Sequence, residues 1–448
     1  MPLNDSLSIF AAARDAGDVP GLRVGDRIYT FAQLADMTKR RLVTLSPELR
    51  DGMPYRLEGT NALETLITLY ALLEIRVPAL LVHPKLTPPE RAALAIAAAR
   101  AGPLSHTDAA AIIFTSGTTG EPRGAVLTRS GLVASAQASA ANLGWQSDDA
   151  WLLCMPIARV GGLSIVTRCL AARRCAVLVA GFDAAHFPEW IAAWRITLVS
   201  LVPTMLTRVF DAHPDWKAPS HLRCVVLGGA TASSRLLRHA QDRQLPIILT
   251  YGLTETTSQV VATPYAARFA PADCGAGIAL RGIGVRVDNG RIEVRGPTLM
   301  AGYWNETPLI SDAWVDTGDL GEIDASGFLH VHSRREDLIV TGGENAYPAE
   351  VERTLEAFPG IAAAGVFGLP DEVWGHTVAA ALVAEASPPP DAALFDYVSR
   401  HLAPHKRPRH VCYLPRLPHG PSGKLDRRAL AENPPLLRPL LPAGEPRA

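Results

Sequence analysis

The chain has 448 residues, of which 48% are apolar and 19% are charged, and its formal net charge is −1. A chain of this length and composition buries a large core and is divided into more than one domain, which excludes a disordered protein. The near-neutral charge offers no basic footprint for nucleic acid or for an anionic membrane surface. We therefore expect a soluble globular protein that acts on small molecules.

No stretch of the sequence reads as a membrane span or as a targeting segment. Residues 1–17 lack a basic region followed by an apolar core and a small-residue cleavage site. The apolar stretch at residues 66–82 is interrupted by charged residues and a proline, and residues 92–99 are too few to cross a bilayer. The six cysteines are scattered without a C-x-x-C pair, as in proteins whose thiols stay reduced. We expect a cytoplasmic location.

The first two thirds of the chain are predicted to alternate helices and strands. Helices are expected at residues 30–45, opened by Thr30, and at residues 61–73, 130–142 and 233–243. Short β-rich runs predict strands at residues 79–82, 111–114, 176–179, 198–202, 224–227 and 247–251. This alternation indicates an α/β fold of mostly parallel sheets with helices on both faces.

From about residue 281 the pattern changes to a β-rich subdomain. Strands are expected at residues 284–287, 291–294 and 328–331, with Asp288, Asn289 and Gly290 forming a hairpin turn. A smaller α/β segment follows, with helices at residues 349–357 and 391–401 and strands at residues 363–367 and 378–383. The Pro-rich tail at residues 434–448 is expected to be loosely attached. We predict a large N-terminal domain at residues 1–335 and a small C-terminal domain at residues 336–448.

The most informative motif is IIFTSGTTGEPRG at residues 112–124, where an apolar strand runs into a loop that ends in a cation. Glycines and hydroxyls in such a loop allow backbone N–H groups and side chains to surround a polyphosphate. The motif is neither a Walker loop, because G-x-x-x-x-G-K-[ST] is absent, nor a dinucleotide fingerprint. The candidate phosphate-binding residues are Thr115, Ser116, Gly117, Thr118, Thr119, Gly120 and Arg123.

This loop resembles the phosphate-binding signature of the adenylate-forming superfamily, which includes acyl-CoA synthetases, luciferases and the adenylation domains of peptide synthetases. The superfamily usually has Lys where this chain has Arg123, and Arg still offers a cation to the phosphates. Four further segments match in the same order: residues 251–256 (YGLTET), 316–319 (DTGD), 333–345 and 421–424 (PSGK). The resemblance covers nearly the whole chain and implies binding of ATP and Mg²⁺.

The resemblance also implies roles for individual residues. Tyr251 offers an aromatic face to adenine, and the aspartate Asp319 accepts hydrogen bonds from the ribose hydroxyls. Thr254 contacts the α-phosphate, and Glu255 supplies a hard oxygen ligand for Mg²⁺. Arg334 reaches the ribose or a phosphate. The backbone residues implied to line the adenine pocket are Gly228, Gly229, Ala230 and Gly252.

Lys424 is implied as the catalytic cation. Activation brings an anionic carboxylate against an anionic α-phosphate, and a cation that bridges them offsets the repulsion. The chain has only five lysines, so a lysine retained inside the motif is informative. Glu336 is the implied hinge about which the small domain rotates, bringing Gly342 and Gly343 to the site for the transfer step.

Two stretches, residues 254–261 and 334–350, are most similar to the 2-succinylbenzoate–CoA ligases, a branch of short members. Their acid carries a second carboxylate, so the pocket needs a cation. The branch usually has an aromatic residue and His where this chain has Ala158, expected to open space, and Arg159, which adds charge. A different aromatic or dicarboxylic acid therefore stays open. The implied acyl pocket comprises Arg159, Gly162, Leu163, Arg168 and Ser258.

These motifs predict an ATP-dependent acid–thiol ligase. The sequence contains no carrier-protein segment with a phosphopantetheine serine, so coenzyme A is the expected acceptor. One alternative is an adenylation enzyme that loads a separate carrier protein, and another is a non-catalytic homologue that binds nucleotide or acyl ligand. Retention of Lys424, Glu255 and Asp319 argues against the second alternative. No nucleic-acid or membrane partner is expected, and a homodimer is left open.

Overall fold

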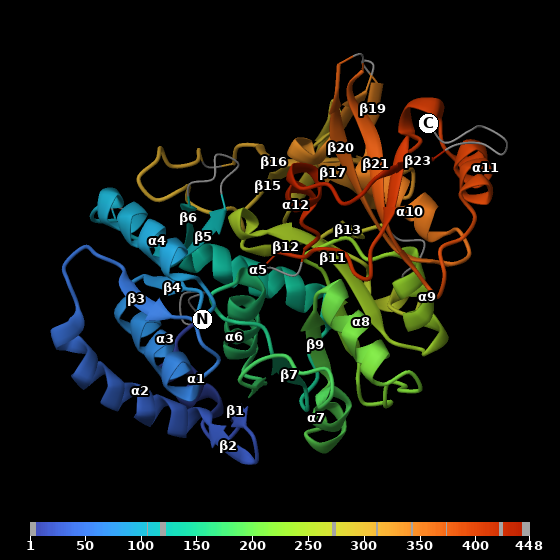
Figure 1. Ribbon diagram of the computed structural model, residues 1–448. Helices are drawn as coiled ribbons and strands as arrows, with labels where there is room; N and C mark the ends of the chain where they lie inside the picture. The colour runs from blue at the N-terminus through green and yellow to red at the C-terminus, as the bar shows by residue number, and fades with distance from the viewer. Residues whose placement is uncertain are drawn as a thin grey trace.

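The computed structural model describes residues 6–104, 106–116, 122–270, 275–310, 312–341, 344–372, 374–420 and 424–440, without the side chains of Ser333 and Glu336. Within these ranges the chain has a mixed α/β architecture with a separate C-terminal sheet (Figure 1), which confirms the predicted fold class. No helix in the same ranges is long and apolar enough to cross a membrane.

The largest sheet has nine strands among the described residues. In spatial order they are β13 (Ile278–Ala279), β12 (Ser258–Ala262), β11 (Ile247–Leu253), β10 (Cys224–Leu227), β9 (Leu198–Leu201), β7 (Ala150–Leu153), β8 (Cys175–Leu178), β1 (Pro20–Val24) and β2 (Arg27–Thr30). Neighbours from β11 through β1 run parallel, and the strands at both edges run antiparallel. The parallel core therefore has one carboxyl edge, where loops from several strands meet.

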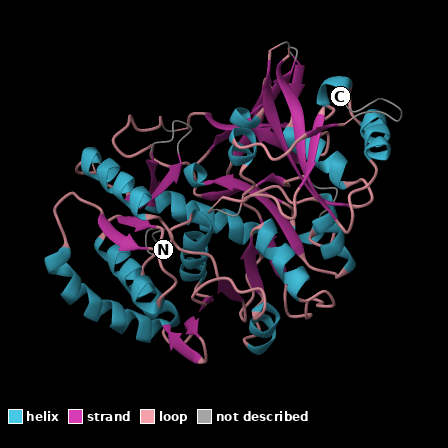
Figure 2. Cartoon of the chain, in the orientation of Figure 1, coloured by secondary structure: helices cyan, strands magenta, loops and turns pink. Residues whose placement is uncertain are grey.

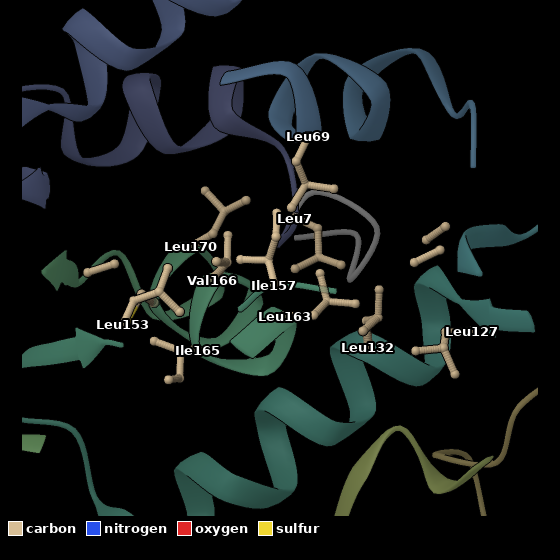
Figure 3. Packing of buried hydrophobic residues seen from close by; sticks show 14 of the residues in the cluster. Leu7, Leu69, Leu127, Leu132, Leu153, Ile157, Leu163, Ile165, Val166 and Leu170 are labelled. Carbon is tan, nitrogen blue, oxygen red and sulfur yellow. The ribbon is translucent and has the colours of Figure 1, made fainter. Parts of the chain in front are cut away.

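Helices cover both faces of this sheet (Figure 2). They are α1 (Ile9–Ala16), α2 (Phe31–Leu45), α3 (Leu63–Ile75), α5 (Arg129–Leu143), α6 (Val160–Ala172), α7 (Phe187–Ala193), α8 (Pro203–Ala212) and α9 (Ser234–Asp242). Strand β7 shows why two layers form: Trp151 and Leu153 pack in one core with α5 and α6, and Leu152 packs in the other with α7 to α9. Successive strand side chains alternate between faces. Figure 3 shows the first core, with Leu163 and Val166 facing Leu69 and Leu7.

A smaller sheet contains the two strands that flank the predicted phosphate loop. Its order is β3 (Tyr55–Glu58), β4 (Ala79–Val82), β5 (Ala109–Ser116) and β6 (Pro122–Thr128), with α4 (Pro88–Ala101) alongside. The strand β4 is fully buried, as its unbroken apolar run predicts. Strands β5 and β6 pair antiparallel, with Thr115 opposite Arg123, so these two predicted phosphate-binding residues lie side by side.

The predicted β-rich subdomain is an antiparallel sheet of β14 (Gly284–Asp288), β15 (Arg291–Arg295), β16 (Val315–Ile323) and β17 (Leu329–Arg334). Asn289 and Gly290 join β14 to β15 with φ angles of 48° and 76°. Two left-handed residues in a row are what a type I′ hairpin turn requires, and Asn-Gly satisfies it at the lowest steric cost. The hairpin prediction is confirmed.

Residues 339–440 form a C-terminal lobe with its own hydrophobic core, shown in orange to red in Figure 1. Its strands are β18 (Ile339–Thr341), β19 (Glu344–Ala346), β20 (Ile361–Asp371), β21 (Gly375–Ala384), β22 (His410–Tyr413) and β23 (Arg438–Pro439). Its helices are α10 (Pro348–Glu356), α11 (Asp391–His401) and α12 (Arg427–Glu432). Strand β20 pairs with β21, which also contacts β18 and β22.

The described part of the Pro-rich tail is not loosely attached, so that prediction was wrong there. Arg438 and Pro439 form β23 against β22, and Leu440 is 3% exposed in the core of the lobe. Arg438 Nη2 also donates to Asp391 Oδ1 at 2.7 Å. Proline is tolerated because β23 is an edge strand, where a missing N–H leaves no ladder bond unmade. Residues 441–448 lie outside the described ranges.

Candidate active site

The YGLTET segment forms a sharp turn at the end of β11. Thr254 and Glu255 lie on a 3₁₀ turn (Thr254–Thr256) that leads into β12. A Cβ at Gly252 would lie 1.8 Å from the Ser258 carbonyl oxygen, so only glycine allows the chain to return this closely. The segment therefore presents Thr254 and Glu255 at the carboxyl edge of the parallel sheet.

The glycines predicted to line the adenine pocket lie at the same edge. Gly228 follows β10, the parallel neighbour of β11, and a Cβ there would lie 2.6 Å from Thr250 Cγ2. Gly229 has a φ of +80°, which favours glycine, and both it and Ala230 are exposed. The structure thus brings Gly228, Gly229 and Ala230 beside the strand that ends in Tyr251.

Tyr251, Asp319 and Arg334 form one cluster. Tyr251 Oη donates to Asp319 Oδ2 at 2.8 Å, and Arg334 Nε lies 3.7 Å from Asp319 Oδ1. Asp319 and Arg334 are directly opposite in the β16–β17 pair, which explains why they meet. Burial raises the pKa of the Asp319 carboxyl, and the Tyr251 hydrogen bond and the Arg334 cation act against that rise. An ionised carboxylate held this way keeps further acceptor sites for a ligand hydroxyl.

Lys424, from the C-terminal lobe, lies against this cluster. Burial, the largest cause, lowers the pKa of its ammonium below the ordinary lysine value, although the residue keeps solvent contact. The cations Arg334 and Arg159 lower this pKa further, and the carboxylates Asp319 and Glu255 raise it. Four charged side chains from separate segments are therefore near one lysine. Sequence order alone does not dictate this convergence.

The phosphate-loop residues are placed in part. Thr115 and Ser116 end β5, and Arg123 lies near the start of β6. Gly117, Thr118, Thr119 and Gly120 lie outside the described residues. Arg123 donates to Glu306 from Nε at 2.9 Å and from Nη2 at 2.5 Å, and its Cζ lies 3.6 Å from the centroid of the Tyr303 ring.

Tyr303 and Glu306 were not predicted from the sequence. Tyr303 Oη donates to Glu255 Oε1 at 2.9 Å, which links the phosphate-loop arginine to the predicted magnesium ligand. Burial and the Glu255 carboxylate raise the pKa of Tyr303 to about 12, so the hydroxyl stays a donor at neutral pH. Arg123 and Glu306 are 183 residues apart, and no local pattern signals a contact at that separation.

Four of the predicted acyl-pocket residues belong to α6 or to its N-terminal cap, and Ser258 begins β12. Arg159 is half-buried at the N-terminal cap of α6. Its backbone bonds to Pro156 and Leu163, whereas its side chain makes no hydrogen bond or ion pair with another described residue. Arg168 is 3% exposed; its Nη2 donates to Ser258 Oγ at 3.4 Å, and its Nε has no partner in the described part of the chain. Burial lowers the pKa of Arg168 to about 10, so it remains a cation at neutral pH.

Ala158 does not open the space expected of it. A Cβ at Gly59 would lie 2.5 Å from the Ala158 Cβ, so the loop after β3 fills the place of a larger side chain. A Cβ at Gly162 would lie 2.3 Å from the Pro156 carbonyl, which explains the glycine there. Leu163 is 1% exposed inside the core of Figure 3, and its place in the acyl pocket stays a prediction.

The predicted hinge lies between the β-rich sheet and the C-terminal lobe. The backbone forms a 3₁₀ turn at Arg335–Asp337, and Asp337 lies 3.6 Å from Arg427 of α12. The side chain of Glu336 and both Gly342 and Gly343 lie outside the described residues. Their roles as hinge and transfer loop remain predictions.

The C-terminal lobe also has a cavity of about 230 Å³ that the sequence did not predict. Arg409 Cζ lies 4.5 Å from the centroid of the Trp374 ring, whose side chain is 42% exposed. The cavity combines an aromatic face with several cations. It is lined by Thr341, Trp374, Val378, Pro404, His405, Arg407 and Arg409.

Two family models match the chain. The AMP-binding enzyme model covers residues 94–304, and the AMP-binding enzyme C-terminal domain covers residues 350–424. The chain is 38% identical over 343 residues to the 2-succinylbenzoate–CoA ligase of Bacillus thuringiensis subsp. konkukian (strain 97-27), covering 73% of this chain and 70% of that protein. The ligase of Bacillus mycoides (strain KBAB4) is also 38% identical, over 340 residues, with the same two coverages.

Solved structures of related enzymes are also similar to this chain. The o-succinylbenzoate CoA synthetase (MenE) of Bacillus subtilis, in complex with the acyl-adenylate intermediate OSB-AMP, superposes with a TM-score of 0.83 at 30% identity, covering 94% of this chain and 97% of that one. The same synthetase has been solved with ATP and a magnesium ion, again with a TM-score of 0.83. ATP-bound MatB from Rhodopseudomonas palustris superposes with a TM-score of 0.83 at 26% identity, covering 95% and 98%.

Proposed function

The chain belongs to the family of AMP-binding enzymes, and on that premise we propose that it joins a carboxylic acid to coenzyme A at the expense of ATP. In the first half-reaction the carboxylate attacks the α-phosphorus of ATP, giving an acyl-adenylate and pyrophosphate. In the second, the thiol of coenzyme A attacks the acyl carbon and AMP leaves. The observation that carries the proposal is the convergence of Lys424 with Asp319, Glu255 and Arg334.

For adenylation, Lys424 bridges the acid carboxylate and the α-phosphate oxygens. Both groups are anionic, so a cation fixed between them favours their approach and the transition state. Thr254 donates to the α-phosphate, and the Tyr251–Asp319 pair holds the adenosine. Glu255 offers the hard oxygen ligand that Mg²⁺ prefers, and Mg²⁺ bound there offsets charge on the phosphates. The cation of Arg123 takes the place of the lysine that is usual in the superfamily.

The acid proposed for this site is 2-succinylbenzoate, the substrate in the names of the Bacillus relatives. It carries a carboxylate beyond the one that is activated. Arg159 is half-buried and near Lys424, and within the described residues it has no ion-pair partner. A cation without a partner next to the reaction centre suits a second carboxylate. Arg168 adds positive charge behind the pocket through its contact with Ser258.

The acceptor proposed is coenzyme A, and the cavity of the C-terminal lobe supports it. An adenine ring stacks on an exposed aromatic side chain, and phosphates pair with arginines. Trp374, Arg407 and Arg409 supply these groups. We propose that the lobe, as residues 336–448, rotates about Glu336 against residues 1–335. Lys424 serves the first half-reaction, and Gly342 and Gly343 the second.

We further propose a cytoplasmic location and a homodimer. ATP and coenzyme A are cytoplasmic substrates, and the cysteines in the described ranges are all free thiols, as in a reducing compartment. Light scattering on the purified chain tests the oligomer, with the mass of two chains expected.

The function is tested by incubating the chain with ATP, Mg²⁺ and a panel of succinyl-aromatic, aromatic and medium-chain acids, with and without coenzyme A. We expect acid-dependent pyrophosphate exchange, and thioester only when coenzyme A is present. Lys424→Ala should lower exchange by about 10²–10³-fold, because it removes the bridging cation. Lys39→Ala, on an exposed position of α2, is the matched control.

Exchange without thioester formation would favour the enzyme that loads a carrier protein. The absence of any acid-dependent exchange in the folded chain would refute the proposed function. Equal exchange in Lys424→Ala and in the wild type would refute only the lysine assignment.

A further inference from the structure

A loop after Gly302 lies between the phosphate hairpin and the predicted magnesium ligand. It is fixed against β6, where the Trp304 N–H donates to the Gly124 carbonyl at 2.7 Å. Two side chains of this loop, Tyr303 and Glu306, contact charged groups of the ATP site, although neither belongs to the motifs that predicted that site.

The Tyr303 side chain contacts both Glu255 and Arg123. Its hydroxyl donates to Glu255 Oε1 at 2.9 Å, and the guanidinium of Arg123 lies over its face at 3.6 Å. The backbone carbonyl of Glu255 also accepts from the N–H of Met300, two residues before Gly302, at 2.8 Å. The loop therefore holds the side chain of Glu255, and the segment that leads into the loop holds its main chain. The hydrogen bond from Tyr303 orients Oε1 of Glu255, and Oε2 of the same carboxylate remains for a metal.

Glu306 binds the Arg123 guanidinium in the way that a phosphate would. It accepts from Nε at 2.9 Å and from Nη2 at 2.5 Å, the two-point geometry with which a guanidinium also binds phosphate. Both side chains are partly exposed, at 37% for Arg123 and 46% for Glu306. The ion pair is therefore weak enough for another anion to replace Glu306 on Arg123.

We propose that Tyr303 positions Glu255 for Mg²⁺ and that Glu306 is an internal anion which competes with the phosphates of ATP for Arg123. Both statements rest on the proposed function, because they assign roles toward Mg²⁺ and ATP in that reaction. A hydrogen bond that orients a metal-binding carboxylate raises the affinity for the metal. An internal ion pair that must open before ATP binds lowers the affinity for ATP.

The first part is tested by Tyr303→Phe, which keeps the ring beneath Arg123 and removes only the hydroxyl. The Mg²⁺ concentration for half-maximal pyrophosphate exchange should rise about tenfold, whereas the rate at saturating Mg²⁺ should change little. Tyr413→Phe is the matched control, because its hydroxyl has no hydrogen-bond partner in the described part of the chain. An unchanged Mg²⁺ dependence in Tyr303→Phe, with a wild-type melting temperature, overturns the positioning role.

The second part is tested by Glu306→Gln, which keeps the shape and removes the charge. The KM for ATP should fall about two- to fivefold, the change expected when an exposed ion pair no longer has to open. Glu293→Gln, which breaks the exposed pair with Arg286 (2.7 Å), should leave this KM unchanged. A KM for ATP that stays the same or rises in Glu306→Gln overturns the competition.

These outcomes are separable from failure of the proposed function. If the wild-type chain shows no acid-dependent exchange, the proposed function fails and the inference falls with it. In that case calorimetry should give the same affinity for Mg·ATP in the wild type and in both variants. If the wild type is active and the variants match it, only the inference fails.

Discussion

At the scale of single residues, the candidate site contains arginine side chains that have no carboxylate partner among the described residues. Arg159 has no ion pair among the described residues. Arg168 is buried, with a long hydrogen bond to Ser258 Oγ and the Trp151 ring centroid 5.7 Å from its guanidinium, but with no carboxylate paired to it in the described part of the chain. A buried or half-buried cation without an anion is costly unless a ligand supplies one. Lys424 differs, because it is exposed and the carboxylates of Asp319 and Glu255 lie near it and raise its pKa against the effect of burial. The second carboxylate of the proposed acid is an anion that can pair with Arg159.

A prediction at this scale concerns the second carboxylate of the acid. Arg159→Gln should lower kcat/KM for 2-succinylbenzoate about 10- to 100-fold, the effect of losing a charge-assisted hydrogen bond of about 1.5–3 kcal/mol. A monocarboxylic aryl acid should be little affected, because it makes no such contact. Steady-state assays with both acids measure the ratio, and Arg100→Gln, at an exposed position of α4, is the control. Equal losses for both acids would contradict the assignment.

At the scale of elements, helix α10 carries a carboxyl group that makes the C-terminal lobe sensitive to pH. Glu356 accepts from the Ala364 N–H at 3.3 Å, which ties the helix to β20. Burial, the main cause, and the nearby Glu352 raise the pKa of Glu356 from 4.5 to about 7. The folded lobe therefore holds this proton between about pH 4.5 and 7, whereas the unfolded chain releases it. Stability from this group is present at low pH and is lost as the pH rises through 7.

The corresponding prediction uses Glu356→Gln, which keeps the acceptor oxygen and cannot ionise. Between pH 5 and 8 the free energy of unfolding of the wild type should fall by up to about 3 kcal/mol more than that of the variant. The difference is smaller to the extent that solvent reaches the half-buried carboxyl. Scanning calorimetry at both pH values measures the difference. The exposed Glu372→Gln is the control. A variant with the same pH dependence as the wild type would show that Glu356 is ionised in the folded lobe.

At the scale of the whole molecule, the proposed function assigns the two half-reactions to different residues of the C-terminal lobe. Lys424 lies near Asp319, Arg334 and Glu255 of the proposed ATP site, and α9 meets the lobe through the ion pair of Arg235 with Glu385. The cavity of Trp374 and Arg409 is a separate feature of the lobe. A lobe that serves both steps has to move between them, which is the motion proposed about Glu336.

Arg409→Ala tests this division of labour. The KM for coenzyme A should rise about tenfold in thioester formation, because a cation for a phosphate is lost, at about 1.4 kcal/mol. Acid-dependent pyrophosphate exchange should keep the wild-type rate, since that step does not involve coenzyme A. Arg400→Ala, at an exposed position of α11, should change neither measurement. A parallel loss of both activities would indicate a general defect of the lobe.

The sequence by itself determined the local features of this protein. Thr30 and Gln33 form the capping box of α2, and Asn289 and Gly290 form the hairpin turn, because each depends on neighbours within a few residues. The strand β4 and the helix α11 begin and end where the sequence predicts, since their hydrophobic patterns are local too. The ordered motifs, read with the resemblance, predicted the family that the comparisons show.

The tertiary structure decided what depends on distant contacts. Arg123 meets Glu306 across 183 residues, and Gly59 fills the space beside Ala158, and no pattern along the chain encodes either contact. The tail at β23 is held by pairing with β22 and by the burial of Leu440, which its prolines did not indicate. The surroundings of Lys424 follow from how the lobe sits on the sheet. Local energetics fix turns and caps, whereas the partner of a charge depends on which surfaces the fold brings together.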